Sequence, residues 1–104
     1  MYARVVNVPM KPEKSGESNT IWQDSVLPAV RGQAGFKGLL VLATPARDKS
    51  MSITLWESEA DMKANEASGY YQAQVDKFVK LIDGAPIREH YVVVLQASAT
   101  DARL

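Results

Sequence analysis

The sequence predicts an α+β domain in which strand, helix, strand, strand, helix and strand follow one another. Two stretches carry most of this prediction. SITLWESEADMKANEASGYY, residues 52–71, begins with β-branched and aromatic residues and continues with Ser58 and an acid three positions later, the pattern that starts a helix. FKGLLVLAT, residues 36–44, is an almost continuous apolar run, which indicates a strand with both faces covered.

The first half of the chain supplies one strand and one helix. Residues 2–8 alternate as a strand that places Tyr2, Arg4, Val6 and Val8 on one face, and prolines follow it. Apolar residues at helical spacing over 21–30 predict a helix. Pro28 lies inside that stripe, so we expect it to kink the helix or to separate its last part.

The second half supplies a hairpin, a broken helix and a last strand. Residues 36–44 and 50–57 are expected to pair antiparallel around a polar turn. A helix over 59–66 is interrupted at residues 68–69, and a second segment carries apolar residues at helical spacing from Tyr71 to Ile82. The last strand is expected over 87–96. Residues 1–96 therefore form one domain, and residues 97–104, small and polar, a flexible C-terminal tail.

This order is the split arrangement of a ferredoxin-like sheet, a βαββαβ fold with four antiparallel strands and both helices on one face. The second and fourth strands carry apolar residues at alternate positions of both faces, for example Leu39 and Val41 in one and Tyr91, Val93 and Leu95 in the other. The face of the sheet that the helices do not cover would therefore be apolar. Each exposed side chain of this kind costs about 1.5–3 kcal/mol relative to burial. The sequence therefore predicts a homodimer that packs through its sheet faces.

Composition excludes several classes of partner. Among 104 residues, 12 Lys and Arg balance 12 Asp and Glu, so no net charge attracts nucleic acid or an anionic membrane. The chain has no cysteine, which excludes disulfides and thiolate chemistry. Its beginning fits neither a signal peptide nor a membrane span, so we expect a cytoplasmic protein.

Several motifs resemble one family. The Gly35-Phe36 entry to the second strand, the Leu55-Trp56-Glu57-Ser58 junction and the closing REHYVVVLQ are similar to the antibiotic biosynthesis monooxygenase domain of the dimeric α/β-barrel superfamily. The resemblance covers roughly residues 2–96. It implies a ferredoxin-like protomer that packs on a twin to form a dimeric α/β barrel, with a pocket between sheet and helices. Its members include cofactor-free monooxygenases of quinols and polyketides and haem-degrading enzymes.

Two departures argue against haem cleavage. The haem-degrading branch uses an asparagine on the first strand and a tryptophan and a histidine on the second helix. Asn7 matches the asparagine, but Asn65 and Val75 occupy or adjoin the other two positions, and a valine cannot ligate iron. With one histidine and no clustered acids, we also expect no metal site. The resemblance to the cofactor-free monooxygenases implies a reaction without a cofactor.

His90 and Asn7 are the candidate catalytic residues. His90 is the only histidine and so the only side chain that ordinarily titrates near neutral pH, which suits a general base that deprotonates a phenol. A histidine hydrogen-bonded at the rim of the sheet or at a dimer interface is the alternative. Asn7 would bind a substrate oxygen or, alternatively, a backbone group, because a buried amide without partners costs about 1–3 kcal/mol.

Four residues are candidates for substrate binding: Trp22, Trp56, Tyr71 and Arg88. The tryptophans could stack on a flat ligand or belong to the core. Tyr70 and Tyr71 are adjacent, so we expect only Tyr71 to face the pocket. Arg4 is expected to be a surface or interface charge, and Glu66 part of a solvated helix start.

Two functions follow as hypotheses. One is a cofactor-independent monooxygenase of a small aromatic, quinol-like or polyketide-like substrate. The other is a non-catalytic dimeric module that binds a small molecule or serves a stress response. A cavity that cannot hold a ring, or a His90 sealed away from it, would favour the second.

Overall fold

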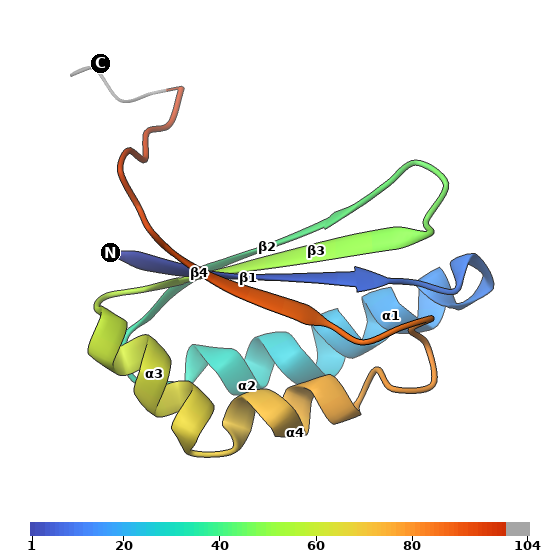
Figure 1. Ribbon diagram of the computed structural model, residues 1–104, viewed down its shortest axis with the longest axis horizontal. Helices are drawn as coiled ribbons and strands as arrows, with labels where there is room; N and C mark the ends of the chain where they lie inside the picture. Colours follow the sequence, from blue (N-terminus) through green and yellow to red (C-terminus); the bar gives the residue numbers. More distant parts are fainter. Residues whose placement is uncertain (100–104) are drawn as a thin grey trace.

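The computed structural model describes residues 1–99 as one sheet with every helix on the same face (Figure 1). The strands are β1 (Tyr2–Pro9), β2 (Phe36–Ala43), β3 (Lys49–Trp56) and β4 (Ile87–Val92), in the spatial order β2-β3-β1-β4. All three pairings are antiparallel. The helical elements are η1 (Pro12–Lys14), α1 (Ser15–Ile21), η2 (Trp22–Val26), α2 (Leu27–Arg31), α3 (Glu59–Ala67) and α4 (Tyr70–Asp76). The predicted ferredoxin-like α+β fold is confirmed.

Pro28 disturbs the first helix without breaking it. The helix runs from α1 into α2 through η2, a π-helical turn in which the Leu27 N–H donates to the Trp22 carbonyl five residues back. A proline has no N–H and crowds the carbonyl four residues before it, here that of Asp24. The expected kink or separate segment is therefore a widened turn just before the proline.

The junction between β3 and α3 is fixed from two sides. The Ser58 hydroxyl accepts the Asp61 N–H at 3.1 Å, as the predicted helix cap requires. Gly35, in the left-handed region at φ 78°, accepts the Glu57 N–H through its carbonyl at 2.7 Å. A Cβ at Gly35 would overlap the Asp61 side chain, so this close approach requires glycine.

The second helical region is broken as predicted but ends earlier. Gly69, at φ 86°, separates α3 from α4, and α4 stops at Asp76 rather than continuing to Ile82. The reason lies in the backbone of the following residues. The Lys11 N–H donates to the Leu81 carbonyl, and the Asp83 N–H to the Pro9 carbonyl, so this segment is bonded to the end of β1 instead of to a helix.

β4 is also shorter than the predicted 87–96. Its last pair is Val92 with Tyr2, the first residue of β1. Residues 93–99 therefore pair with no further strand, and the Val93 N–H makes one bond to the Met1 carbonyl. Val94 and Leu95 are 91% and 78% exposed as the chain leaves the sheet away from the helices (Figure 1). The predicted flexible tail at 97–104 lies mostly outside the described residues.

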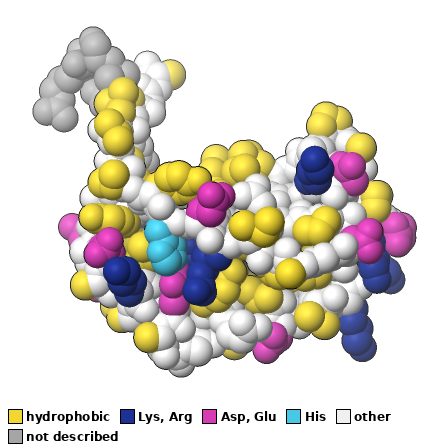
Figure 2. All heavy atoms as spheres, viewed as in Figure 1, with side chains coloured by type: hydrophobic (Ala, Val, Ile, Leu, Met, Phe, Trp, Pro, Cys, Tyr) yellow, Lys and Arg dark blue, Asp and Glu magenta, His cyan; other side chains and the backbone are white. Residues whose placement is uncertain are grey.

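The two faces of the sheet differ sharply. The helices cover one face with a core in two clusters, centred on Phe78 and on Trp56. The other face carries the exposed side chains of Leu40, Leu42, Ile87 and Tyr91, and hydrophobic side chains are visible along this upper side in Figure 2. Within residues 1–99, no helix is long and apolar enough to cross a membrane.

Candidate functional site

Arg4 is a buried cation on the helix-covered face of β1. It shares that face with Tyr2, Val6 and Val8 and is only 4% exposed. Its Nη1 donates to the Asn65 Oδ1 at 2.9 Å and to the Glu66 Oε2 at 3.3 Å. The expectation of a surface or interface charge is therefore wrong for this protomer.

Glu66 is the acceptor at the centre of the site. Its Oε2 lies 2.7 Å from the His90 Nε2, and its Oε1 lies 3.7 Å from the Arg88 Nη1. The Glu66 side chain is only 12% exposed, so the expectation of a solvated acid is also wrong. On α3, Glu66 is four residues after Met62, which is fully buried, so both lie on the inward stripe of the helix.

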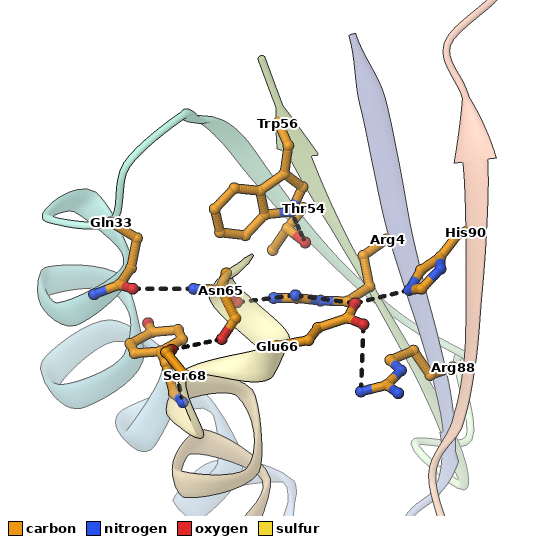
Figure 3. A network of polar contacts seen from close by, with 10 residues as sticks. Arg4, Gln33, Thr54, Trp56, Asn65, Glu66, Ser68, Arg88 and His90 are labelled. Atoms are coloured by element: carbon orange, nitrogen blue, oxygen red, sulfur yellow. Dashed lines mark hydrogen bonds and ion pairs between the residues drawn. The ribbon is translucent and has the colours of Figure 1, made fainter. Parts of the chain in front are cut away.

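The register of the sheet brings these groups together. Arg4 pairs with His90 and Val6 with Arg88 across β1 and β4, so all four side chains share the helix-covered face. Figure 3 shows the resulting line of contacts, from Gln33 on the loop after α2 through Asn65, Arg4 and Glu66 to His90 at the edge strand. Asn65 joins the line by donating to the Gln33 Oε1 at 3.0 Å.

Aromatic rings flank the two guanidinium groups. The Arg4 Cζ lies 5.1 Å from the Trp56 ring centroid and 4.8 Å from that of Tyr71, and the Arg88 Cζ lies 4.7 Å from the same Tyr71 ring. Burial lowers the pKa of Arg4, and the charge and hydrogen bond of Glu66 partly oppose this. Burial raises the pKa of Tyr71, partly opposed by Arg88 and Arg4. The site is therefore held by cation–π contacts as well as by ion pairs.

The hydrogen bond to Glu66 defines the proton on His90. A carboxylate oxygen accepts, so the hydrogen bond assigns the Nε2–H tautomer to a neutral His90 ring, in which the Nδ1 is an acceptor. The His90 side chain is 35% exposed, and Figure 2 shows the histidine at the surface between basic and acidic side chains. His90 therefore lies at the rim of the site.

A cavity of about 80 Å³, the inner cavity, lies between the sheet and the helices beside this network. Arg4, Tyr70 and Tyr71 are among its polar lining residues, and Val75 and Phe78 are among its apolar side chains. Both tyrosines line it, contrary to the expectation that only Tyr71 would. The Tyr70 hydroxyl is buried and has no hydrogen-bond partner among residues 1–99, and burial raises its pKa.

A larger cavity of about 610 Å³, the outer cleft, lies between β2 and the first helix. It shares four lining residues with the inner cavity: Met10, Ser18, Trp22 and Ser50. The Trp22 ring stacks at 5.1 Å on Phe78, in the wall between the two. Trp22 is thus a candidate ligand contact for both spaces.

The predicted site residues fall into four places. Tyr71 and Trp22 line the inner cavity, whereas His90 and Arg88 contact Glu66 outside its lining. Trp56 is fully buried in the core, with its Nε1 donating to the Thr54 hydroxyl at 2.9 Å. Asn7 alternates with Arg4 along β1 and so lies on the helix-free face, away from His90.

The sequence analysis missed Arg4 and Glu66 as site residues, although a signal for each was present. Arg4 shares a strand face with three apolar residues, which indicates a buried, paired charge. Glu66 follows Met62 by one helical turn on the inward stripe. Among residues 1–99, no group of three His, Cys, Asp or Glu side chains could hold a metal ion.

Comparisons with known proteins agree with this architecture. The family model described as antibiotic biosynthesis monooxygenase matches residues 1–77. No curated protein matches the chain. A protein of unknown function from Nitrosomonas europaea superposes with a TM-score of 0.75 at 16% identity, covering 93% of this chain and 92% of that chain.

Two solved oxygenases are also similar. A monooxygenase from Streptomyces coelicolor, in complex with the ligand nanaomycin D, has a TM-score of 0.71 at 17% identity over 92% of both chains. SnoaB, a cofactor-independent oxygenase from Streptomyces nogalater, has a TM-score of 0.73 at 11% identity over 91% of this chain and 94% of that one. At these identities the likeness concerns the fold alone.

Proposed function

The chain belongs to the antibiotic biosynthesis monooxygenase family, and we propose that it oxygenates a small phenol or quinol without a cofactor. The family match and the activities stated for the two Streptomyces structures support this reaction class.

The unpartnered hydroxyl of Tyr70 carries the proposal. Tyr70 lines a mainly apolar cavity that Arg4 also lines, and a buried hydroxyl without a partner among residues 1–99 costs about 1–3 kcal/mol. A phenolate oxygen bound here would accept the Tyr70 O–H and lie in the field of a guanidinium. Such an arrangement favours the ionised form of the substrate, which is the form that reacts with oxygen.

The proposed reaction balances without an external reductant. The phenol loses its O–H proton, and the anion transfers one electron to O₂. The resulting radicals combine to form a C–O bond at a ring carbon that carries hydrogen, ortho or para to the phenol oxygen in a phenol and ortho to it in a quinol. Loss of the C–H proton and cleavage of the O–O bond give a quinone and one water. The substrate is oxidised by four electrons, and O₂ accepts all four.

The residues behind Arg4 have a positioning role in this scheme. Glu66 holds the Arg4 guanidinium, and His90 and Arg88 hold Glu66. His90, with its free Nδ1 at the rim, is also placed to exchange protons with solvent. The catalytic roles predicted for Asn7 and His90 stay predictions.

The substrate would extend from the inner cavity into the outer cleft. A cavity of about 150 Å³ holds benzene in a known case, so about 80 Å³ does not hold a ring. The outer cleft has about 610 Å³ and shares the Trp22 wall. Movement of the Trp22 side chain would join the two spaces.

We further propose that the helix-free sheet face packs on a second copy of the chain in the cytoplasm. The exposed side chains of Leu40, Leu42, Ile87 and Tyr91 supply an apolar surface on this face. Burying large side chains of this kind gains about 1.5–3 kcal/mol each. The homodimer would leave the helix-covered face, and so the site, free in each protomer.

A quinol panel tests the reaction. Under air we expect oxygen uptake and a quinone that carries one atom of heavy-isotope oxygen gas, and under nitrogen no product. Tyr70→Phe should slow turnover about 10- to 100-fold, as loss of a transition-state hydrogen bond does. Tyr91→Phe, on the opposite face of the sheet, is the matched control, and its turnover rate should equal that of wild type. Asn7→Ala and His90→Gln test the catalytic roles predicted for these two residues.

The non-catalytic binding module is favoured by one observation. The inner cavity is smaller than a ring requires, and His90 does not line it. If oxygen uptake is absent across the panel while the same quinols bind saturably, the chain is a binding module. Equal rates in Tyr70→Phe and wild type would contradict the assignment of the inner cavity as the reaction site.

A further inference from the structure

The outer cleft has an apolar wall that no segment of residues 1–99 covers. Trp22 and Leu27 from the helix face Leu39 and Val41 from β2 across about 610 Å³. All four side chains are only half-buried. α2 packs against β2 near Phe36, and the cleft opens from there toward the β2–β3 hairpin. A flat apolar ligand would remove this surface from water.

The charge of the cleft is one-sided. Arg31, Arg47 and Lys49 line it, and none of its lining residues within the described range is a carboxylate. None of the three cations has an ion pair with residues 1–99, although other cations of the chain, such as Lys37 and Lys63, do. Charge complementarity therefore points to an anionic ligand.

The hairpin also carries one acid, Asp48, whose pKa is lowered mainly by its hydrogen bond with Thr44 and less strongly by the charge of Lys49. Asp48 receives the Thr44 hydroxyl at 2.6 Å, and the Thr44 oxygen in turn accepts the backbone N–H groups of Asp48 and Lys49. The neighbouring residue, Arg47, has a φ of 63°. This angle lies in the left-handed region, which residues other than glycine rarely adopt. Such strained residues concentrate at binding sites, where the surrounding structure holds them in place.

The three cations lie at opposite ends of the cleft. The helix runs antiparallel to β2, so Arg31 lies near Phe36, at the start of the strand, while Arg47 and Lys49 follow its end. Eight residues of strand span roughly 26 Å, so one anionic group cannot contact both ends. The hairpin end offers two cations together with Ser15 and Asn19 as hydrogen-bond donors.

We propose that the outer cleft binds an aromatic carboxylate, with its carboxylate at Arg47 and Lys49 and its rings against Trp22 and Val41. Two neighbouring cations suit a carboxylate, and the hydroxyl and amide of Ser15 and Asn19 can satisfy its remaining lone pairs. The proposal does not depend on catalysis in the inner cavity.

Amide chemical-shift titration with naphthoate and with naphthamide, its neutral analogue, tests the proposal. Naphthoate should bind saturably, with a Kd below about 1 mM and shifts at residues 15–22 and 39–49. Naphthamide should bind about tenfold more weakly, and Arg47→Gln with Lys49→Gln should weaken naphthoate by at least that factor. Arg31→Gln removes one charge at the far end and should change the Kd less than twofold.

Several results would overturn the proposal. These are equal affinity for the two probes, or a loss of naphthoate affinity in Arg31→Gln as large as that in the Arg47→Gln, Lys49→Gln variant. Chemical shifts confined to the helix-free face around Leu40, or no saturable binding, would also overturn it. Thermal melts of the variants establish that they fold. Tyr70→Phe, which alters only the inner cavity, should leave naphthoate binding unchanged, so that failure of the oxygenase reaction and failure of this site are separately visible.

Discussion

Replacing Glu66 by Gln should destabilise the protein strongly, because it leaves the Arg4 guanidinium buried without a counter-charge. Arg4 is 4% exposed, and Glu66 is its only carboxylate partner within residues 1–99. The side chains of Arg88 and His90 are 41% and 35% exposed, so water can replace the contacts that they lose with the Glu66 carboxylate. The cost is therefore concentrated on Arg4.

The magnitude follows from that burial. Removing one partner of a buried ion pair costs about 3–5 kcal/mol. Arg4 keeps its 2.9 Å bond to Asn65, so we expect about 3 kcal/mol, near the lower limit. For a domain of this size, such a loss lowers the Tm by about 12–24 °C. Arg4→Met removes the buried charge itself and leaves Glu66 its contacts with Arg88 and His90, so it should cost less, about 1–2 kcal/mol.

Urea unfolding at one fixed protein concentration measures both values, since dimerisation would make stability depend on concentration. Glu59→Gln is the matched control, because its ion pair with Lys63 is exposed and should be worth at most about 0.5 kcal/mol. The double variant Glu66→Gln with Arg4→Met should be more stable than Glu66→Gln alone. If Arg4→Met costs as much as Glu66→Gln or more, the reasoning about the uncompensated charge is refuted.

Three further perturbations have defined outcomes. Burial raises the folded-state pKa of Tyr70 and Tyr71, so the stability they contribute is present below the unfolded value of about 10 and is lost as pH rises above it. Unfolding free energy measured from pH 9 to 11 should therefore fall less steeply in the double Phe variant. Leu40→Asp, on the helix-free face, should halve the mass seen by analytical ultracentrifugation. Gly35→Ala should cost more than about 1 kcal/mol in urea unfolding, because it needs a positive φ and its methyl group meets Asp61.

Each of these has a control and a contrary result. Val79→Asp changes a 59% exposed residue outside the sheet and should leave the mass unchanged. Gly16→Ala, in α1 with open space around it, should stabilise by about 0.5–1 kcal/mol. Equal pH slopes for wild type and the Phe variant, an unchanged mass in Leu40→Asp, or a stable Gly35→Ala would each contradict the corresponding argument.

The parts of the fold that depend on local patterns could be predicted from the sequence. The Ser58 cap and the break at Gly69 are written in a few adjacent residues, and the structure contains both. The lengths of β4 and α4 could not be predicted, because they depend on where β1 begins and ends. A strand stops when its neighbour has no residues left to pair with.

The site was harder to predict because its central ion pair joins distant residues. Arg4 and Glu66 are 62 positions apart, and although each shares a face with apolar residues, no local pattern in the sequence pairs one with the other. Only the pairing of β1 with β4 and the inward stripe of α3 bring them to His90. The contact between His90 and Glu66 agrees with the alternative of a hydrogen-bonded histidine at the rim, and the catalytic role of His90 stays a prediction.

The π-helical turn η2 gives the first helix one residue more than a regular α-helical path through the same turn would need. Deleting one residue between Trp22 and Val26 would restore a regular helix and rotate α1 by about 100° relative to α2. Ser15 and Ser18 would then turn away from the outer cleft, while β1 and α2 kept their places. A change of one residue in length at this turn would thus exchange residues that line both cavities while the fold stays the same. The length of this segment therefore determines what the protein can bind as much as its composition does.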